Sequence, residues 1–225
     1  IGIKALKLLA KLGYEVDYLE HADSGRAYMS KGLLPEAQTL AKQNVHTFFD
    51  WINKDVPLIG IEPSAILSFR DEYPRLVDKQ DVEKARKLAQ NCLIIDEFIA
   101  KEFEKGNITS TQFTKASKQI KLHGHCHQKS LSSVDYSIRL MSIPENYHVE
   151  NITSGCCGMA GSFGYEKEHF EVSMQVGELV LFPTVRNTTE DILIAAPGTS
   201  CRHQIKDGTQ RHALHPVEIL HDALL

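Results

Sequence analysis

Four of the five cysteines stand in three separate loops, where their thiolates could serve as soft metal ligands. Cys126 follows one short apolar run, the adjacent pair Cys156 and Cys157 follows a second, and Cys201 follows a third, with the spacing C-x29-CCG-x42-C. Thiolates select iron–sulfur clusters, zinc or copper(I). We therefore expect these four cysteines to converge on one metal centre, with an iron–sulfur cluster as the first expectation and zinc as the alternative.

Glycines on both sides of the cysteine pair suit this role. Gly155 and Gly158 allow the sharp turn that two adjacent inward-pointing ligands require, because side chains alternate in a regular strand. Backbone amides in such a loop can donate to a thiolate. Cys201 is predicted near the start of a helix, where the helix dipole favours the thiolate form.

Histidines and basic residues gather near the same loops. Each could support the centre by hydrogen bonding, ligate it, carry protons or bind a carboxylate substrate, and each could equally be an ordinary loop or surface residue. No catalytic residue is predicted. The candidates in the second half of the chain are His123, His125, His127, His169, Arg202 and His203, and those in the first half are Arg26, Lys31 and Arg70.

The totals exclude several classes of protein. An odd number of cysteines with one adjacent pair does not suggest a secreted disulfide framework, and Cys92 is expected to pack in a core. The net charge of −4 without a basic run argues against nucleic acid as a partner. No apolar stretch approaches the roughly 18 residues of a membrane span, and no signal peptide is evident. We expect a cytoplasmic protein whose only route to a membrane is through a partner.

The apolar pattern predicts alternating strands and helices. Strands are expected at 14–19, 57–61, 119–123, 147–152 and 192–196, and the expected helices are 6–12, 33–52, a helix from Pro63, 81–105, 168–182, one containing Cys201 and one from Pro216. This order predicts an α/β fold built from βαβ-type units with mainly parallel sheets. Sites in such sheets form beyond the carboxyl ends of the strands, where all four cysteines are predicted.

The two halves of the chain look like an internal duplication. Tyr14-Glu15-Val16 matches Tyr147-His148-Val149 at an offset of 133 residues, Ser24-Gly25 matches Cys157-Gly158 at the same offset, and Pro63 matches Pro197 one residue further on. The fold is therefore predicted to contain two pseudo-duplicated units.

The motifs resemble the cysteine-rich CCG domain. This domain occurs in heterodisulfide reductase, in the iron–sulfur subunits of glycolate oxidase and anaerobic glycerol-3-phosphate dehydrogenase, and in lactate utilisation proteins. The similarity is greatest to the C-terminal tandem CCG region of fused FAD-linked oxidases of the D-lactate dehydrogenase type. The segments that carry it are GIEPSAILSFRDEYP, HGHCHQKSL, SGCCGMAGSFGYEKEH and APGTSCRHQIKDG.

The resemblance implies an electron-transfer role in the oxidation of D-2-hydroxy acids. A flavin would take the hydride, and iron–sulfur centres would pass electrons onward. The FAD domain and a ferredoxin-like segment would lie upstream, so this chain, which lacks an initiator methionine, is expected to be a C-terminal fragment that is not catalytic alone. Residues 1–115 would be a first CCG-like repeat without its cysteines, and residues 116–225 the metal-binding repeat.

Two departures from the family pattern limit these implications. Gly198 stands where the family's CxxC would place a fifth cysteine, so four thiolates remain, which suit a four-iron cluster or a tetrahedral zinc rather than a non-cubane cluster. In the first repeat, Asp23-Ser24-Gly25 replaces CCG and Ala65 replaces a further cysteine. The alternatives are a structural zinc domain that docks a flavin domain, and direct thiol chemistry at Cys156 and Cys157.

Overall fold

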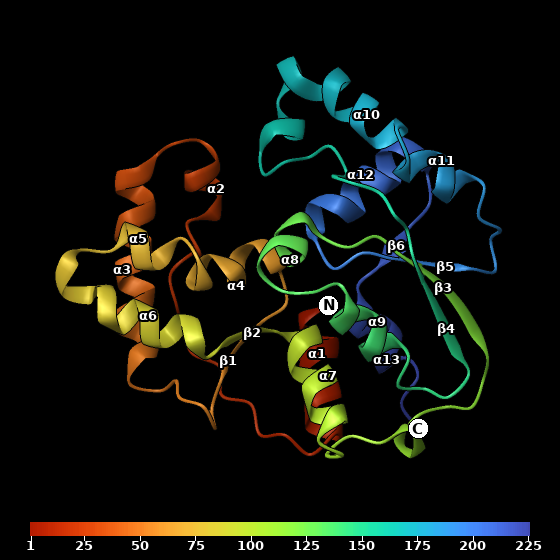
Figure 1. Cartoon of the computed structure of the whole chain (residues 1–225), viewed down its shortest axis with the longest axis horizontal. Coiled ribbons are helices and arrows are strands. Elements are labelled where there is room, and N and C mark those ends of the chain that lie inside the picture. The colour runs from red at the N-terminus through yellow and green to blue at the C-terminus, as the bar shows by residue number, and fades with distance from the viewer. The chain divides into compact units, whose positions relative to one another are not determined.

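The chain forms two compact units, described separately below. The computed structural model describes residues 1–225, of which 1–16 and 96–225 form the first unit and 17–95 form the second (Figure 1). Each unit contains a parallel sheet with helices around it, so the predicted α/β class is confirmed. No helix combines the length and the apolar composition that crossing a membrane requires.

The first unit is built on a four-stranded parallel sheet in the order β4-β3-β5-β6. Ile120 of the central strand β3 pairs with Val149 of β4 and with Leu193 of β5. Because β4 and β5 lie on opposite sides of β3, the chain changes direction there, and the gap beyond β3 and β5 is a topological switch point. The strands are β3 (Lys118–Leu122), β4 (Tyr147–Asn151), β5 (Leu193–Ala195) and β6 (Ala213–Leu214).

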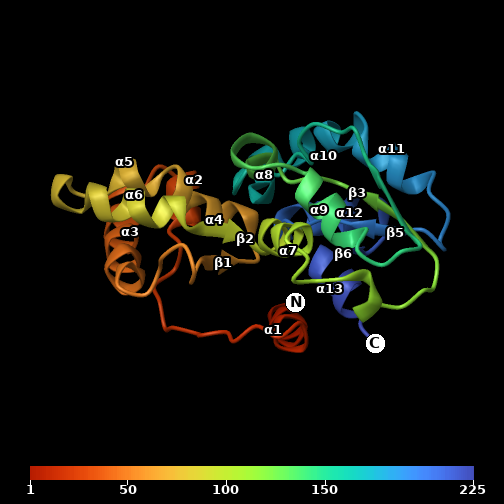
Figure 2. The ribbon, with the colours of Figure 1, turned by 60° about the horizontal axis from the view of Figure 1, so that its bottom comes forward.

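Two groups of helices surround this sheet. The first packs together around α13, which contacts both α1 and α9, and the second consists of α10, α11 and α12, which contact one another (Figures 1 and 2). The helices of the unit are α1 (Gly2–Lys11), α7 (Ile95–Glu104), α8 (Cys126–Leu131), α9 (Asp135–Met141), α10 (Phe170–Glu178), α11 (Leu181–Arg186), α12 (Thr199–Thr209) and α13 (Pro216–His221), with short 3₁₀ turns at Ser110–Gln112, Phe163–Tyr165 and Lys167–His169.

Local signals in the sequence account for the helix ends. Pro216 occupies the first turn of α13, where its missing N–H costs nothing, and the side chains of His215 and Glu218 cap that turn reciprocally. Two glycines also bring helices together. A Cβ at Gly177 of α10 or at Gly208 of α12 would lie 2.3 Å from the Phe182 ring, which is buried between these helices. This close packing sets the position of α12, which carries Cys201.

The second unit has a two-stranded parallel sheet. Leu58 of β1 pairs with Cys92 of β2, and Gly60 pairs with Ile94. Its strands are β1 (Leu58–Gly60) and β2 (Cys92–Ile94), and its helices are α2 (Arg26–Ser30), α3 (Leu34–Phe49), α4 (Pro63–Arg70), α5 (Tyr73–Leu76) and α6 (Val82–Gln90), with a 3₁₀ turn at Lys79–Asp81.

Three predicted elements differ in the structure. Residues 14–19 form no strand, because Val16 and Tyr18 are exposed rather than paired in a sheet, while Tyr14 packs edge-on against Phe98. The predicted helix at 81–105 is divided: α6 ends before Asn91, and β2 precedes α7. Cys92 is fully buried as expected, but on a strand. The predicted helix at 168–182 is two helices, α10 and α11.

The division into units differs from the boundary expected between residues 115 and 116. Two of the matched positions have similar local structure: Gly25 and Gly158 both adopt positive φ, and Pro63 and Pro197 both lie between a strand and the helix after it, Pro63 as the first residue of α4 and Pro197 two residues before α12. The third match does not, since residues 14–16 lack the strand found at 147–149. The two repeats at 1–115 and 116–225 stay a prediction.

The Phe182 contact generates a prediction about α12. We expect Gly208→Ala to lower the free energy of unfolding by about 1–3 kcal/mol, because the new methyl group overlaps the ring. Urea unfolding measures this, with exposed Lys206→Ala on the same helix as the control. Phe182→Leu should lower the free energy of unfolding by less in the Gly208→Ala variant than in the wild type. Additive costs would contradict the assigned contact.

Candidate metal centre

The two outer cysteines lie next to each other. Cys126 is the first residue of α8, directly beyond β3, and its Sγ lies 3.7 Å from the Sγ of Cys156 in the loop beyond β4. A disulfide needs about 2.05 Å, so these are two thiols in contact rather than a bonded pair. Both side chains are partly exposed.

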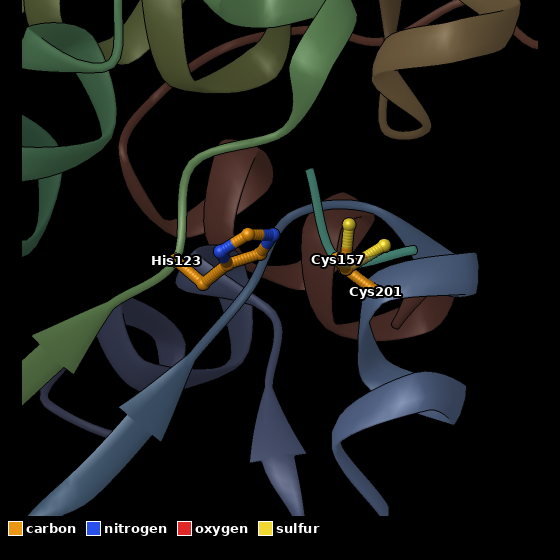
Figure 3. Close-up of side chains that lie close together, drawn as sticks. All are labelled: His123, Cys157 and Cys201. Carbon is orange, nitrogen blue, oxygen red and sulfur yellow. The ribbon is translucent and has the colours of Figure 1, made fainter. Parts of the chain in front are cut away.

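The two inner cysteines are buried with a histidine. Cys157 is 1% exposed, and Cys201, in the first turn of α12, is fully buried. The ligand-capable atoms of Cys157, Cys201 and His123 all lie within 4.8 Å of one another (Figure 3). Cys157 also contacts Cys156, so the four sulfur atoms form a continuous group at the carboxyl ends of β3, β4 and β5.

Close contact shifts the pKa values of the four thiols in opposite directions. The hydrogen bond between Cys126 and Cys156 raises the pKa of Cys126 and lowers the pKa of Cys156. Contacts with Cys156 and then with Cys201 raise the pKa of Cys157, whereas the contact with Cys157, assisted by His123, lowers the pKa of Cys201. The four thiols therefore share protons among themselves, and a nearby cation would allow all of them to ionise.

The loop around the cysteine pair presents backbone amides to sulfur. The N–H of Gly158 donates to Cys156 Sγ at 3.3 Å, and the N–H of Ala160 also lowers the pKa of Cys156, after the larger effect of Cys126. Gly158 has φ +106°, and a Cβ there would lie 2.1 Å from the carbonyl oxygen of Ser173. Only glycine fits this position. By contrast, a Cβ at Gly155 would meet nothing within 4 Å.

Lys129, which sequence reasoning missed, fastens this loop to α8. Its Nζ donates to the carbonyl oxygens of Ser154 at 2.7 Å and Gly155 at 3.0 Å. Lys129 lies one helical turn after Cys126, and that spacing is the only signal of its role in the sequence. These contacts connect α8 to the loop after β4.

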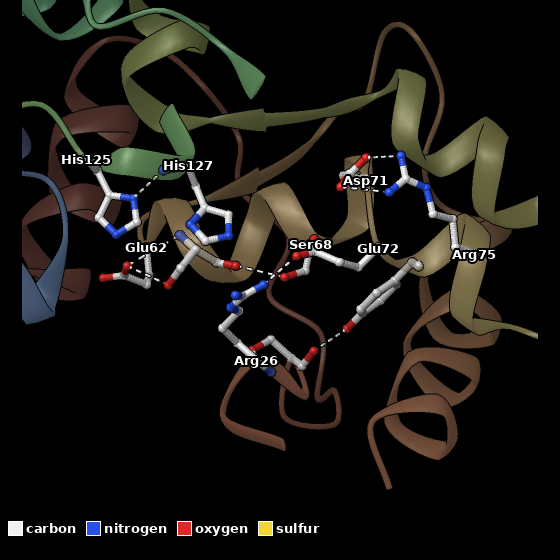
Figure 4. A network of polar contacts seen from close by, with 11 residues as sticks. Arg26, Glu62, Ser68, Asp71, Glu72, Arg75, His125 and His127 are labelled. Carbon is white, nitrogen blue, oxygen red and sulfur yellow. Dashed lines mark hydrogen bonds and ion pairs between the residues drawn. The ribbon is translucent and has the colours of Figure 1, made fainter. Parts of the chain in front are cut away.

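The three histidines around Cys126 have different surroundings. His123 is fully buried, and its Nδ1 lies 2.7 Å from the hydroxyl of Ser154. His125 is the N-cap of α8, where its Nδ1 accepts from the backbone N–H of His127 (Figure 4). The structure thus brings His123 to the sulfur group and assigns His125 a capping role. Ser154 is a second residue that sequence reasoning missed.

Gly198 has a structural explanation. A Cβ at this position would lie 2.2 Å from Cδ2 of His125. Any larger residue there, including the cysteine of the related pattern, would require the His125 ring to move. The imidazole therefore occupies the space beside Cys201 that a fifth thiol would need.

The other candidates of the second half make their own contacts. Arg202 donates to the carbonyl oxygens of Ala196 at 2.9 Å and Pro197 at 2.7 Å, and so fixes the turn before Cys201. His203 is exposed and bonds to Tyr165. His169 stacks on Phe163, with its ring 3.1 Å from the carboxylate of Glu166. These contacts give Arg202 a structural role and leave His203 and His169 at the surface.

The basic candidates of the first half belong to the second unit. Arg26 begins α2 and forms an ion pair with Glu72 (Figure 4). Arg70 donates to the carbonyl oxygen of Cys92 at 2.7 Å, which joins α4 to β2. Lys31 is an exposed residue at the end of α2. Within their unit, Arg26 and Arg70 thus connect elements of the fold.

The donor set fits a bound metal. Four thiols supply four soft ligands, oriented amides stabilise negative charge on one of them, and the buried Nε2 of His123 has no hydrogen-bond partner. A cation at this point would allow the protonated thiols to ionise. The residues therefore suit either a four-iron cluster or a single tetrahedral metal.

The chain is similar to parts of several dehydrogenases. It is 26% identical over 216 residues to D-2-hydroxyglutarate dehydrogenase of Escherichia coli, a match that covers 96% of this chain and 20% of the relative. It is 23% identical to one of the subunits of anaerobic glycerol-3-phosphate dehydrogenase of Escherichia coli, in a match that covers 100% of this chain and 55% of the relative. It is 28% identical to lactate utilization protein A of Bacillus subtilis, in a match that covers 87% of this chain and 80% of the relative.

These matches concern a part of larger proteins. The chain spans about a fifth of the length of the D-2-hydroxyglutarate dehydrogenases it matches, so those relatives contain further domains. No family model matches the chain, and no solved structure matches it significantly. The relatives are parts of oxidoreductases, in keeping with the sulfur-rich site described above.

A buried polar chain positions α8. Gln128 donates to Ser137 Oγ at 2.8 Å, and the Ser137 hydroxyl donates to the carboxylate of Asp96, which is fully buried. Burial raises the pKa of Asp96, and His215 opposes this shift. The chain connects α7 and α9 to the helix that carries Cys126.

The Asp96 carboxylate gives the first prediction for this site. Because its folded pKa is raised, the native state should lose stability as the pH rises above the ordinary aspartate value of 3.8, by up to about 1.4 kcal/mol per pH unit until the folded pKa is passed. Asp96→Asn keeps the acceptor for Ser137 and removes this dependence. Urea unfolding of metal-free protein should therefore show that the free energy of unfolding of Asp96→Asn increases relative to that of the wild type as the pH rises. The exposed control Asp135→Asn should show no such increase. A constant difference would contradict the assignment.

The two glycines of the loop give a matched pair for the second prediction. Gly158→Ala should lower the free energy of unfolding by about 1–3 kcal/mol and greatly reduce metal content, because the new methyl group overlaps the Ser173 carbonyl. Gly155→Ala should change neither, since its Cβ would be in open space. Urea unfolding and metal analysis measure both. Equal effects in the two variants would be inconsistent with this account.

Proposed function

We propose that Cys126, Cys156, Cys157 and Cys201 hold an iron–sulfur cluster and that this chain is the electron-transfer part of a flavin-linked D-2-hydroxyacid dehydrogenase. The observation that carries the proposal is the meeting of four sulfur atoms from three loops at one edge of a parallel sheet. The similarity to parts of dehydrogenases supports the redox role. A four-iron cluster needs four thiolates, which is the number present.

The residues of this chain would hold the cluster and control its surroundings. When bound, the cluster supplies a site that accepts and releases single electrons. The Gly158 amide stabilises negative charge on Cys156, and burial of Cys157 and Cys201 keeps water from the inner side. The partly exposed pair Cys126 and Cys156 provides the side from which electrons would enter or leave.

The substrate chemistry would take place elsewhere in a longer protein. Oxidation of a D-2-hydroxy acid to the 2-oxo acid releases two electrons and two protons, and an FAD domain upstream would accept the hydride. A ferredoxin-like segment would relay electrons to this chain. The relatives named for D-2-hydroxyglutarate and lactate favour a small 2-hydroxy acid as substrate. The cytoplasmic location stays a prediction.

A structural zinc site is the second candidate. The buried group of His123, Cys157 and Cys201 is a nitrogen and sulfur donor set of the kind that zinc uses, and Cys156 could complete a tetrahedron. Such a site would stabilise the fold without redox activity.

Metal analysis after anaerobic purification tests the proposal. We expect brown protein with iron and acid-labile sulfide in near-equal amounts, which dithionite bleaches. Cys157→Ala and Cys201→Ala should each lose most of the iron. Cys92→Ala should retain it, because Cys92 lies in the other unit and its thiol bonds to the Ala89 carbonyl. Colourless wild-type protein with one zinc per chain would refute the electron-transfer role and favour the second candidate.

A further inference from the structure

His123 is a buried imidazole whose Nε2 makes no well-formed hydrogen bond, although the ring contacts the thiol of Cys201. The side chain is fully buried directly beyond β3, and Nδ1 lies 2.7 Å from Ser154 Oγ. Its Nε2 is also buried and has no hydrogen-bond partner. Leaving a buried polar nitrogen unpaired costs stability, so Nε2 calls for an acceptor among the atoms that surround it.

The position of His123 indicates what that partner is. The imidazole lies with Cys157 and Cys201 inside a group whose ligand-capable atoms are within 4.8 Å of one another (Figure 3). His123 follows β3 and Cys201 follows β5, so the two residues face each other at the switch point of the sheet. The backbone N–H of His123 donates to the carbonyl oxygen of Ala195 at the end of β5, and Cys201 lies in the first turn of α12 beyond that strand.

The hydrogen bond to Ser154 is compatible with a ring that carries its proton on Nε2. The Ser154 hydroxyl can rotate to donate to Nδ1, and a neutral imidazole that accepts at Nδ1 carries its proton on Nε2. This tautomer makes Nε2 a donor. The four cysteines already provide one ligand for each iron of a four-iron cluster, so the ring is not needed as a ligand.

We propose that His123 donates a hydrogen bond from Nε2 to the sulfur of Cys201 when the cluster is bound, and that this bond raises the reduction potential of the cluster. The proposal rests on the function proposed above. Reduction adds negative charge to the cluster and its sulfurs, and a donor at sulfur stabilises the more negative state. Ser154 is the positioning residue that keeps the proton on Nε2.

The test compares variants of the full chain that are loaded with iron and sulfide anaerobically. His123→Leu removes the donor, whereas His123→Gln places an amide N–H near the position of Nε2. We expect His123→Leu to retain the cluster with a midpoint potential below that of the wild type, and His123→Gln to recover part of the shift. Ser154→Ala should shift the potential in the same direction by less. Exposed His148→Gln is the matched control and should leave the potential unchanged.

A second measurement on the wild type covers the case in which His123→Leu does not fold. Pulsed EPR of the reduced cluster with ¹⁵N-labelled histidine should show weak nitrogen coupling, as expected for a hydrogen bond to sulfur. Strong coupling, typical of a directly bound nitrogen, would overturn the donor role, as would an unchanged potential in His123→Leu. Wild-type protein without iron would instead overturn the proposed function and this inference with it, so the two failures are distinguishable.

Discussion

The structure depends on the convergence of four sulfur atoms at one edge of a parallel sheet. Four thiols in such close contact cannot all ionise unless positive charge is close by, because each thiolate raises the cost of the next. The pKa shifts alternate along the group for this reason. A metal centre removes the conflict, since it supplies the positive charge and replaces the protons. Under the proposed function, binding of the metal would therefore stabilise the site.

The rest of the first unit holds the loops that carry these sulfurs. Cys126 follows β3, Cys156 and Cys157 follow β4, and Cys201 follows β5, and parallel pairing aligns the three strand ends. The loop after β4 is positioned by contacts at two places. Lys129 binds its carbonyls, and Gly158 lets it pass close to Ser173. Phe182 fills the gap that two glycines leave between α10 and α12.

The second unit uses similar residue types for a different purpose. Where the first unit has Cys157-Gly158, the second has Ser24-Gly25, and both glycines have positive φ although Ser24 carries no sulfur. The Ser24 carbonyl accepts from the Tyr73 hydroxyl at 2.9 Å, and Asn44 donates to the same hydroxyl oxygen. Polar contacts within the unit thus fix the position of this loop.

Local patterns in the sequence were sufficient to predict the α/β class and the candidate thiol ligands, because alternating apolar runs and strand-end cysteines can be recognised without knowledge of the fold. The same patterns misjudged residues 14–19 and 81–105, where a strand needs a neighbour and β2 owes its existence to pairing with β1. The folded arrangement was needed to distinguish His123 from His125, since alternation around Cys126 makes them equivalent in sequence. It also set the roles of Ser154 and Lys129, because hydrogen bonds between separate loops depend on strand order, which no local pattern encodes.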